Sequence, residues 1–575
     1  MKKIAVMGVA IVIILGSFLI TYGIDNQKII YLDDLKYKVE AKTSESLTSD
    51  NNTIEEESTN DAIILEIELD YNQHNKNVLQ NIEASINPIE VKEDMTNREV
   101  NEVRGYAREA IRQYHLEENK VLDELLEIKG YVDKYISHYM PYIEYIFEIE
   151  TFEQCKQKLL ARLSNISFVK TVYVRHTNET SIEEKVCNAL YGMGAGQLFE
   201  SRELTGDGVK VGVLEVGIAD KDHASLVGTN VVAHKQFLHA NSISEHTTAV
   251  AAIIAGHGGM APDATILTSY LYGSPSNEID WLLSKGADII NLSCSDSEPD
   301  GYYGALSAYM DYIVYTYRVT IVAATGNEGG NISTLALGYN VISVGAHNEE
   351  GTNYAYFSNY LYKNGAPEKP TLLARGTTVY VDGFTKNYDG TSFSCAITSG
   401  SIALLMEKRP YLKCYPQLVT AILCANAQQL GNFGAPQTFQ PLASGYGAGK
   451  LHLGNAIDNV YNAYMACCTI NPGSSNDATV IEHRIDLEKG QTLRASLAWL
   501  AKATGKKNET VTGDYDLRLF LPDGQIILSS QCSDSNVELF SYLVEETTTY
   551  VIRITIFSNR VSEEGDLLAL AYAVF

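Results

Sequence analysis

Short apolar segments alternate with helix-like segments through the middle of the chain, and this alternation constrains the fold more than any other feature. Five such segments, mostly uncharged and rich in Val, Ile and Ala, are VKVGVLEVGI, ATILTSYL, ADIINLSC, TIVAATG and VISVGA. Strands that are buried on both faces of a parallel sheet have this composition. The segments NEIDWLLSKG and YGALSAYMDYIVYTYR, which lie between them, predict helices. The alternation therefore predicts a parallel α/β sheet.

The regions on either side have different patterns. Before the α/β region, AIILEIELD, YIEYIFEIE and VKTVYVRHT predict strands, and residues 97–132 predict a long charged helix. A second helix is expected in TFEQCKQKLLARLSN, with Thr151 as its cap. Together these segments predict a small α+β domain with a helical insertion at residues 61–180. Residues 470–575 alternate polar and apolar side chains between turns, which predicts an all-β sandwich.

The N-terminus predicts a membrane segment. Lys2 and Lys3 precede an uncharged apolar run at residues 4–24, which is long enough to span a bilayer. No Ala-x-Ala pattern follows, so for residues 1–24 we favour a signal anchor over a cleaved signal peptide. The lysines would stay in the cytoplasm, so the rest of the chain is expected on the extracellular side, anchored or secreted. Residues 25–60 are expected to form a disordered tether.

Charge and cysteine content exclude several classes of function. The net charge of −27 argues against nucleic acid or anionic lipid as the main partner. The chain has nine cysteines, an odd number that cannot all pair in disulfides within it, and none of their spacings is typical of a metal site. We expect most of them to be small buried hydrophobic residues rather than members of a disulfide framework.

Four residues lie at the ends of predicted strands or at the starts of predicted helices, where parallel α/β sheets form their active sites. Glu215 ends an apolar strand, and Asn327 follows another. His246 begins a helix of small residues, and Ser392 begins a long apolar helix. Each residue taken alone also fits a common structural role: a strand-end acid in solvent, a turn Asn, a helix-end His and an N-cap Ser.

In this order the four residues resemble the motifs of the subtilisin-like serine protease family. GTSFS is similar to the family's nucleophile block, and IVAATGNEGG is similar to its oxyanion block. KGADIINLSCS resembles the strand that lines the substrate groove, and VISVGA with YFSNY resembles the later core. The resemblance covers residues 186–466 and implies a subtilisin-like catalytic domain that acts on peptides or proteins.

The resemblance also implies a role for each residue. Ser392 would be the nucleophile, His246 its general base, and Glu215 the acid that orients the histidine. Asn327 and the backbone N–H of Ser392 would form the oxyanion hole. Residues expected to bind the substrate backbone or line the groove are Ser293, Cys294, Ser295, Ala324, Thr325 and Gly326.

The sequence departs from the family at several positions. Glu215 stands where Asp is usual, and Arg375 and Ala396 stand where Pro is usual. Thr247 and Ala249 replace the usual Gly and second His. One alternative is therefore a catalytically impaired pseudoprotease with a binding or scaffold role. The presence of the His, Asn and Ser motifs favours the active serine endopeptidase, secreted or membrane-anchored.

The flanking domains complete the expectation. Residues 61–180 resemble a subtilase propeptide, which would inhibit the enzyme in the same chain until cleaved. No cofactor is expected to be required. Asp514, Asp516 and Asp523 are calcium candidates without a clear motif, and a solvated turn accounts for them better. A third alternative makes the β-sandwich a carbohydrate- or surface-binding module, but Trp499 is its only tryptophan.

Overall fold

A computed structural model describes most of the chain. The described residues are 4–6, 9–11, 29–32, 62–71, 78, 92–176, 204–234, 242–271, 275–295, 299–363, 365–430, 438, 440–468, 479–502, 513–557 and 566–575. They divide into two compact units. The first consists of Met1–Pro88, Ala107–Ser181 and Tyr272–Asp280, and the second consists of Ile89–Tyr106, Ile182–Leu271 and Trp281–Phe575.

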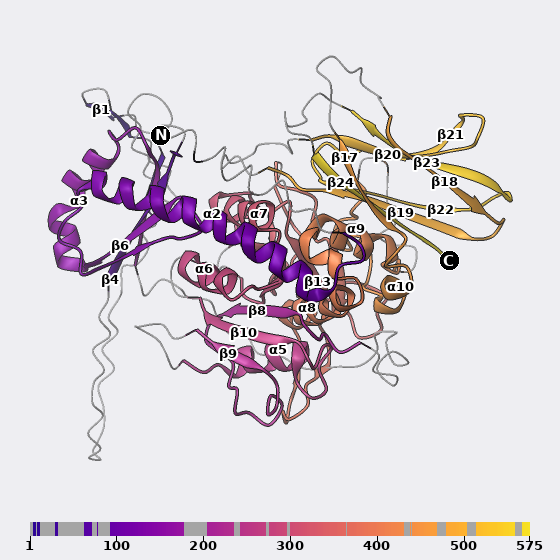
Figure 1. The fold of residues 1–575 in the computed structure, drawn as a ribbon, viewed down its shortest axis with the longest axis horizontal. Helices are drawn as coiled ribbons and strands as arrows, with labels where there is room; N and C mark the ends of the chain where they lie inside the picture. The colour runs from indigo at the N-terminus through magenta and orange to yellow at the C-terminus, as the bar shows by residue number, and fades with distance from the viewer. Residues whose placement is uncertain are drawn as a thin grey trace. The chain divides into compact units, whose positions relative to one another are not determined.

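A seven-stranded parallel sheet forms the centre of the second unit (Figure 1). Its order is β14-β13-β12-β11-β8-β10-β9. The strands are β8 (Lys210–Glu215), β9 (Val231–Ala233), β10 (Thr265–Tyr270), β11 (Ile289–Leu292), β12 (Thr320–Ala324), β13 (Ile342–His347) and β14 (Leu372–Arg375). All their pairings are parallel, which confirms the predicted α/β sheet. The sequence did not predict the short edge strands β9 and β14.

The chain reverses its direction of growth beside β8. Strands β9 and β10 are added on one side of β8, and the chain then crosses to β11 on the other side. In open α/β sheets, ligands bind outside the carboxyl ends of the strands at such a switch point. The carboxyl ends of β8 and β11 are therefore where a site is expected.

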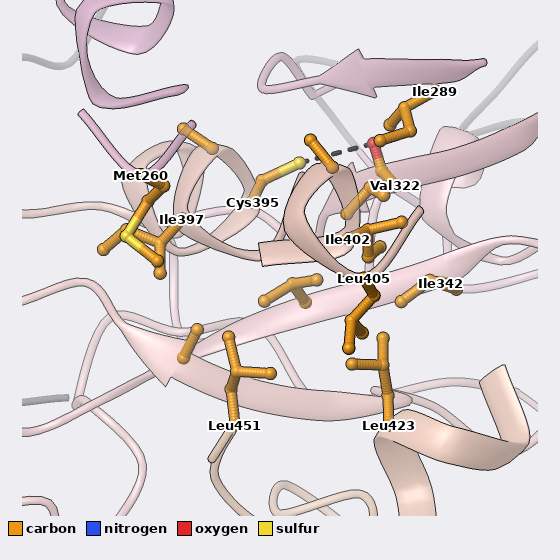
Figure 2. Packing of buried hydrophobic residues seen from close by; sticks show 14 of the residues in the cluster. Met260, Ile289, Val322, Ile342, Cys395, Ile397, Ile402, Leu405, Leu423 and Leu451 are labelled. Atoms are coloured by element: carbon orange, nitrogen blue, oxygen red, sulfur yellow. Dashed lines mark hydrogen bonds between the residues drawn. The ribbon is translucent and has the colours of Figure 1, made fainter. Parts of the chain in front are cut away.

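Helices cover this sheet and supply much of its core. They are α5 (Glu245–Ala255), α6 (Ser276–Ser284), α7 (Ala305–Tyr317), η2 (Thr334–Ala336), α8 (Thr391–Lys408), η3 (Pro410–Cys414), α9 (Pro416–Asn426) and α10 (Leu453–Asp458). Small residues on α5 and α8 let the backbones approach closely, and α8 is buried along nearly its whole length. Figure 2 shows Cys395 of α8 hydrogen-bonded to the carbonyl oxygen of Val322, and Ile397 of α8 beside Met260. A small hairpin of β15 (Val379–Tyr380) and β16 (Asn387–Tyr388) precedes α8.

The C-terminal region is an all-β sandwich, as predicted. One four-stranded sheet has the order β17-β24-β19-β22, and the other has the order β18-β23-β20-β21. The strands are β17 (Ala463–Cys468), β18 (Thr479–Leu487), β19 (Thr492–Trp499), β20 (Tyr515–Phe520), β21 (Ile526–Ser530), β22 (Val537–Leu543), β23 (Thr548–Ile556) and β24 (Asp566–Val574). All their pairings are antiparallel. Strand β17 begins before the expected boundary at 466–470, because residues 463–468 pair with β24.

The first unit contains a five-stranded sheet with the order β3-β7-β4-β6-β5. Its strands are β3 (Ile29–Leu32), β4 (Ala62–Leu69), β5 (Asp133–Ile136), β6 (Tyr142–Glu148) and β7 (Val169–His176). Helix α3 (Ile149–Leu163) also belongs to this unit, and α2 (Asn97–Leu126) continues into it from the second unit.

Two sequence predictions for the first unit were wrong. Residues 29–32 pair in parallel with β7, although they lie in the stretch expected to be a tether. Helix α3 begins at Ile149 with Glu148 as its N-cap, so Thr151 lies inside the helix rather than capping it. The prediction chose Thr151 because Thr is a preferred N-cap residue. The actual N-cap, Glu148, makes no side-chain cap hydrogen bond, so the sequence contained no capping signal at that position.

The apolar run at residues 4–24 is only partly described. Ile4–Val6 (β1) and Val9–Ile11 (β2) form a short antiparallel pair. The rest of the run lies outside the described residues. Within the part of the chain that the structure describes, no helix has the length and apolar character needed to cross a bilayer.

Candidate active site

The acid and the histidine predicted from the sequence lie together in the second unit. Glu215 is the last residue of β8, and His246 lies in the first turn of α5. The Oε2 atom of Glu215 is 3.6 Å from Nδ1 of His246. Their side chains are only 2% and 12% exposed, respectively, so water screens this pair weakly.

Hydroxyl groups fix the helix that carries His246. Ser244 caps α5 by accepting a hydrogen bond from the backbone N–H of Thr247 at 3.2 Å. The hydroxyl of Thr247 in turn donates to the carbonyl oxygen of Gly217 at 3.4 Å. Because Gly217 follows Glu215 by two residues, these bonds join the acid's loop to the histidine's helix. The ring of Phe393 meets His246 edge-on, with the ring centroids 5.5 Å apart.

Ser392 lies in the first turn of α8 and is buried. The preceding Gly390 has a φ of 151°, which a residue with a side chain rarely adopts, so the entry to the helix requires glycine. The hydroxyl of Ser392 donates to the carbonyl oxygen of Ser293 at 2.7 Å, and the hydroxyl of Ser293 donates to the carbonyl oxygen of Ser392 at 2.8 Å. This reciprocal pair joins the start of α8 to the end of β11.

Asn327 is held at the same edge of the sheet. Its Oδ1 atom accepts hydrogen bonds from the backbone N–H of Thr391 at 2.8 Å and from the Thr391 hydroxyl at 3.0 Å. The Thr391 hydroxyl also accepts from the backbone N–H of Gly326 at 3.1 Å. With Oδ1 committed in this way, Asn327 presents Nδ2 as its donor. Sequence reasoning missed Thr391, although its position directly before Ser392 was a signal.

The predicted groove residues follow two neighbouring strands. Ser293, Cys294 and Ser295 come directly after β11. Ala324 ends β12, and Thr325 and Gly326 follow it. Because β11 and β12 are parallel neighbours, both segments lie at the carboxyl edge of the sheet with Glu215.

The residues that depart from the family have clear structural partners. Thr247 makes the bond to Gly217 described above. Arg375 is buried, and it donates to the carbonyl oxygens of Thr377 at 3.1 Å and Thr378 at 3.4 Å. It therefore organises the turn after β14 with hydrogen bonds that a proline could not make. Ala396 is buried inside α8.

The calcium candidates have other partners. Asp516 Oδ2 accepts from Arg518 at 2.6 Å and from Gln531 at 2.9 Å. Asp523 Oδ1 accepts from the backbone N–H of Gln525 at 2.9 Å, as in a capped turn. Across the described ranges, no three His, Cys, Asp or Glu side chains are placed so as to hold a metal ion. The described cysteines Cys155, Cys294, Cys395, Cys414, Cys424 and Cys532 are all free thiols.

Comparison with known proteins identifies the family. Residues 206–449 match the model of the subtilase family, Peptidase_S8. The chain is 30% identical to subtilisin from Bacillus pumilus over 237 residues, which is 36% of this chain and 81% of that protein. It is 31% identical to subtilisin Savinase from Lederbergia lenta over 235 residues, 36% of this chain and 80% of that protein. The chain belongs to the subtilase family.

The comparisons also found two further similarities. The subtilase is 28% identical to subtilisin E from Bacillus subtilis strain 168 over 289 residues, or 45% of this chain and 70% of that protein. Among solved structures it matches the prenylagaramide maturation protease PagA at 27% identity, covering 46% of this chain and 98% of that one, with a TM-score of 0.38. The protein is a serine endopeptidase of the subtilisin kind, and its substrates are peptides or proteins.

Proposed function

We propose that this subtilase cleaves peptide bonds through a triad of Ser392, His246 and Glu215. The observation that carries the proposal is the distance of 3.6 Å between Glu215 Oε2 and His246 Nδ1 in a nearly dry site. A carboxylate in this place fixes the imidazole tautomer with its proton on Nδ1, which leaves Nε2 free to accept a proton. It also stabilises the imidazolium that forms during the reaction.

The reaction begins when the Ser392 hydroxyl leaves Ser293 and turns toward His246. Catalytic hydrogen bonds are often long before substrate binds, and they tighten in the substrate complex. As Ser392 Oγ attacks the scissile carbonyl carbon, its proton moves to Nε2 of His246. That proton then passes to the leaving amine, the C–N bond breaks, and an acyl-enzyme remains. A water molecule, deprotonated by His246, attacks the ester, and Ser392 recovers its proton.

The negative charge that develops on the carbonyl oxygen is stabilised by two donors. One is Nδ2 of Asn327, whose other amide atom is committed to Thr391. The other is the backbone N–H of Ser392, which lies in the first turn of α8, where amide groups lack partners within the helix. A single donor of this kind is worth about 10²–10³ in kcat.

Substrate binding is assigned to the two segments that follow β11 and β12. Ser293, Cys294 and Ser295 form one edge and pair with the extended backbone of the substrate, which adds a strand. Ala324, Thr325 and Gly326 form the facing side of the groove. The mutual bonds between Ser293 and Ser392 support this assignment, because they hold the first segment against the nucleophile.

The remaining parts of the chain have supporting roles in this proposal. Residues 61–180 act as an intramolecular inhibitor that is removed from the groove by cleavage. Residues 1–24 deliver the enzyme to the extracellular side of the membrane, where it is anchored or released. The membrane role of residues 1–24 is supported by the charge and hydropathy pattern of the sequence, in which Lys2 and Lys3 precede the apolar run.

A fluorophosphonate probe tests the triad in the full chain. Labelling should be lost in Ser392→Ala, and Glu215→Gln should slow peptide hydrolysis by about 10⁴ because the imidazole loses its orienting charge. Glu215→Asp withdraws the carboxylate from His246 and should cost on the order of 10²-fold, since an error of about 1 Å has that effect. Equal rates for Glu215→Gln and wild type would show that another group orients His246.

The pseudoprotease alternative has one observation in its favour. The Ser392 hydroxyl donates to the carbonyl oxygen of Ser293, an arrangement in which it is not yet poised for attack. If the folded wild-type chain shows neither labelling nor peptide hydrolysis, this alternative replaces the triad proposal.

A further inference from the structure

A short segment of the predicted propeptide-like region is built into the catalytic unit. Residues 92–106 fall within the 61–180 region, yet they cluster with the second unit. Helix α2 starts in this segment and continues beyond it into the first unit. We call residues 92–106 the clasp.

The apolar side of the clasp packs on η3. Val100 is fully buried against Cys414, and Val103 packs beside them. Tyr411 and Tyr415 flank this cluster, with their own ring centroids 4.4 Å apart. The clasp therefore covers apolar surface that would otherwise be exposed to water.

A buried cluster of three charges lies next to these apolar contacts. Arg104 Nη1 pairs with Asp288 Oδ1, and Lys413 Nζ lies 3.3 Å from Asp288 Oδ2. The side chains of Arg104, Asp288 and Lys413 are 4%, 1% and 0% exposed, respectively. Burial alone would raise the pKa of Asp288, but Lys413 and Arg104 outweigh it and the pKa is lowered. Breaking such a pair leaves a buried charge without compensation, which strongly opposes separation.

A second ion pair closes the edge of the clasp. Arg409, directly after α8, donates hydrogen bonds to both carboxylate oxygens of Glu93. Its Nε donates to Oε2 at 3.0 Å, and its Nη2 donates to Oε1. The guanidinium also donates to the carbonyl oxygens of Val460 at 2.7 Å and Ala463 at 3.2 Å. Its position is therefore set by the catalytic unit before Glu93 is added.

The clasp lies at the opposite end of the sheet from the proposed active site. Asp288 directly precedes β11, whereas Ser293 directly follows it. Strand β11 is buried along its length between these two residues. The contacts of the clasp at Asp288 therefore lie away from the proposed groove residues.

We propose that the clasp holds the N-terminal region to the catalytic domain as a permanent second subunit after the chain is cut between them. Leaving the groove and leaving the enzyme are then separate events. The surface formed by Arg409, Lys413 and Asp288 therefore binds the clasp of the same chain, through Glu93 and Arg104. The proposal does not depend on the triad, because its contacts exist in the uncut chain.

The test uses the full chain with Ser392→Ala, so that it is independent of self-cleavage. A recognition site for an unrelated sequence-specific protease is inserted between residues 181 and 200, with an affinity tag at the C-terminus. After the cut, the tagged fragment is captured under native conditions, and release of the N-terminal fragment is followed over time. We expect the fragment to stay bound and Arg104→Ala to release it at least roughly tenfold faster.

Two further variants keep the test decisive. Arg98→Ala is the matched control, because Arg98 lies on the same helix, is 87% exposed and pairs with Glu102 one turn along that helix. Glu93→Gln changes a half-exposed carboxylate and should speed release several-fold, and it decides the question if Arg104→Ala does not fold. The proposal is overturned if the wild-type fragment leaves at once. It is also overturned if the folded clasp variants release no faster than Arg98→Ala.

Discussion

Two buried groups in the first unit should give opposite responses of its stability to pH. His115 is fully buried, bonds through Nδ1 to the hydroxyl of Tyr71 at 3.0 Å, and has its pKa lowered to about 3 by burial. Asp280 is also fully buried, and burial raises its pKa to about 6. Asp280 accepts hydrogen bonds from Ser137 and from the backbone N–H of His138, both at 2.9 Å.

The sign of each effect follows from proton linkage. Below pH about 6.5 an unfolded histidine takes up a proton that His115 cannot hold when folded, so acidification destabilises the unit through this group. Asp280 behaves in the opposite way: between about pH 4 and pH 6 the folded carboxyl holds a proton that the unfolded one has lost. Its contribution to stability is therefore lost as the pH rises through 6.

The two effects partly offset each other at moderate acidity. From pH 8 to pH 5, His115 should cost about 2 kcal/mol, and Asp280 should return about 1 kcal/mol. The wild-type unit should thus change by about 1 kcal/mol or less through these groups. His115→Asn, whose amide can replace Nδ1 as a partner of Tyr71, should make the unit more stable at pH 5 than at pH 8. Asp280→Asn should show the full histidine loss of about 2 kcal/mol.

The stability of the first unit is measured by amide hydrogen exchange at increasing urea concentrations, in the full chain carrying Ser392→Ala. Protection of residues 111–126 and 142–148, which lie in α2 and β6, reports the first unit separately from the catalytic unit. Exchange rates are corrected for their intrinsic dependence on pH. If both variants keep the wild-type pH dependence, the reasoning about burial is refuted.

Two further changes test the geometry of the active site. Thr391→Val removes one of the two donors that fix Asn327 Oδ1 and should lower kcat by roughly tenfold with little change in KM, whereas Thr391→Ser should restore it. In Gly217→Ala the new methyl group would lie 2.6 Å from Cβ of Ser244, and the φ of 113° at this position disfavours any side chain. The substitution should therefore displace α5 and lower kcat/KM by on the order of 10²-fold. Gly330→Ala is the control for the second change, because nothing lies within 4 Å of its added atom, and steady-state kinetics on a peptide substrate measures both.

The sheet could be predicted from the sequence because its central strands carry their own signal. Strands β8, β10, β11, β12 and β13 are mostly apolar and are buried on both faces, and such a composition in short segments is typical of a buried parallel sheet. The edge strand β9 has only three residues, and β14 ends in Arg375. β9 is too short to show a period, and the charged Arg375 interrupts the apolar pattern of β14, so each is defined by its neighbour in the sheet rather than by its own residues.

The positions of the site residues could be predicted, but the bonds between them could not. Glu215 and Asn327 follow buried strands, which is a local feature of the sequence. The bond from Thr391 to Asn327 joins residues 64 positions apart, and it depends on how α8 enters the sheet edge. The bond from Ser392 to Ser293 spans 99 positions and depends on the backbone at both ends. Residue type and spacing contain no information about these two orientations.

The departures from the family at positions 215 and 247 are structurally linked. A glutamate at the end of β8 reaches further than an aspartate would, so the acid alone does not set its distance from His246. That distance is fixed by the frame around it: Ser244 caps α5, and Thr247 ties the helix to the carbonyl oxygen of Gly217. The glycine that is usual in the family at position 247 could not make this bond, because it has no hydroxyl. Shortening the acid while keeping Thr247 therefore leaves the frame in place, so Glu215→Asp should lose activity rather than restore a more efficient enzyme.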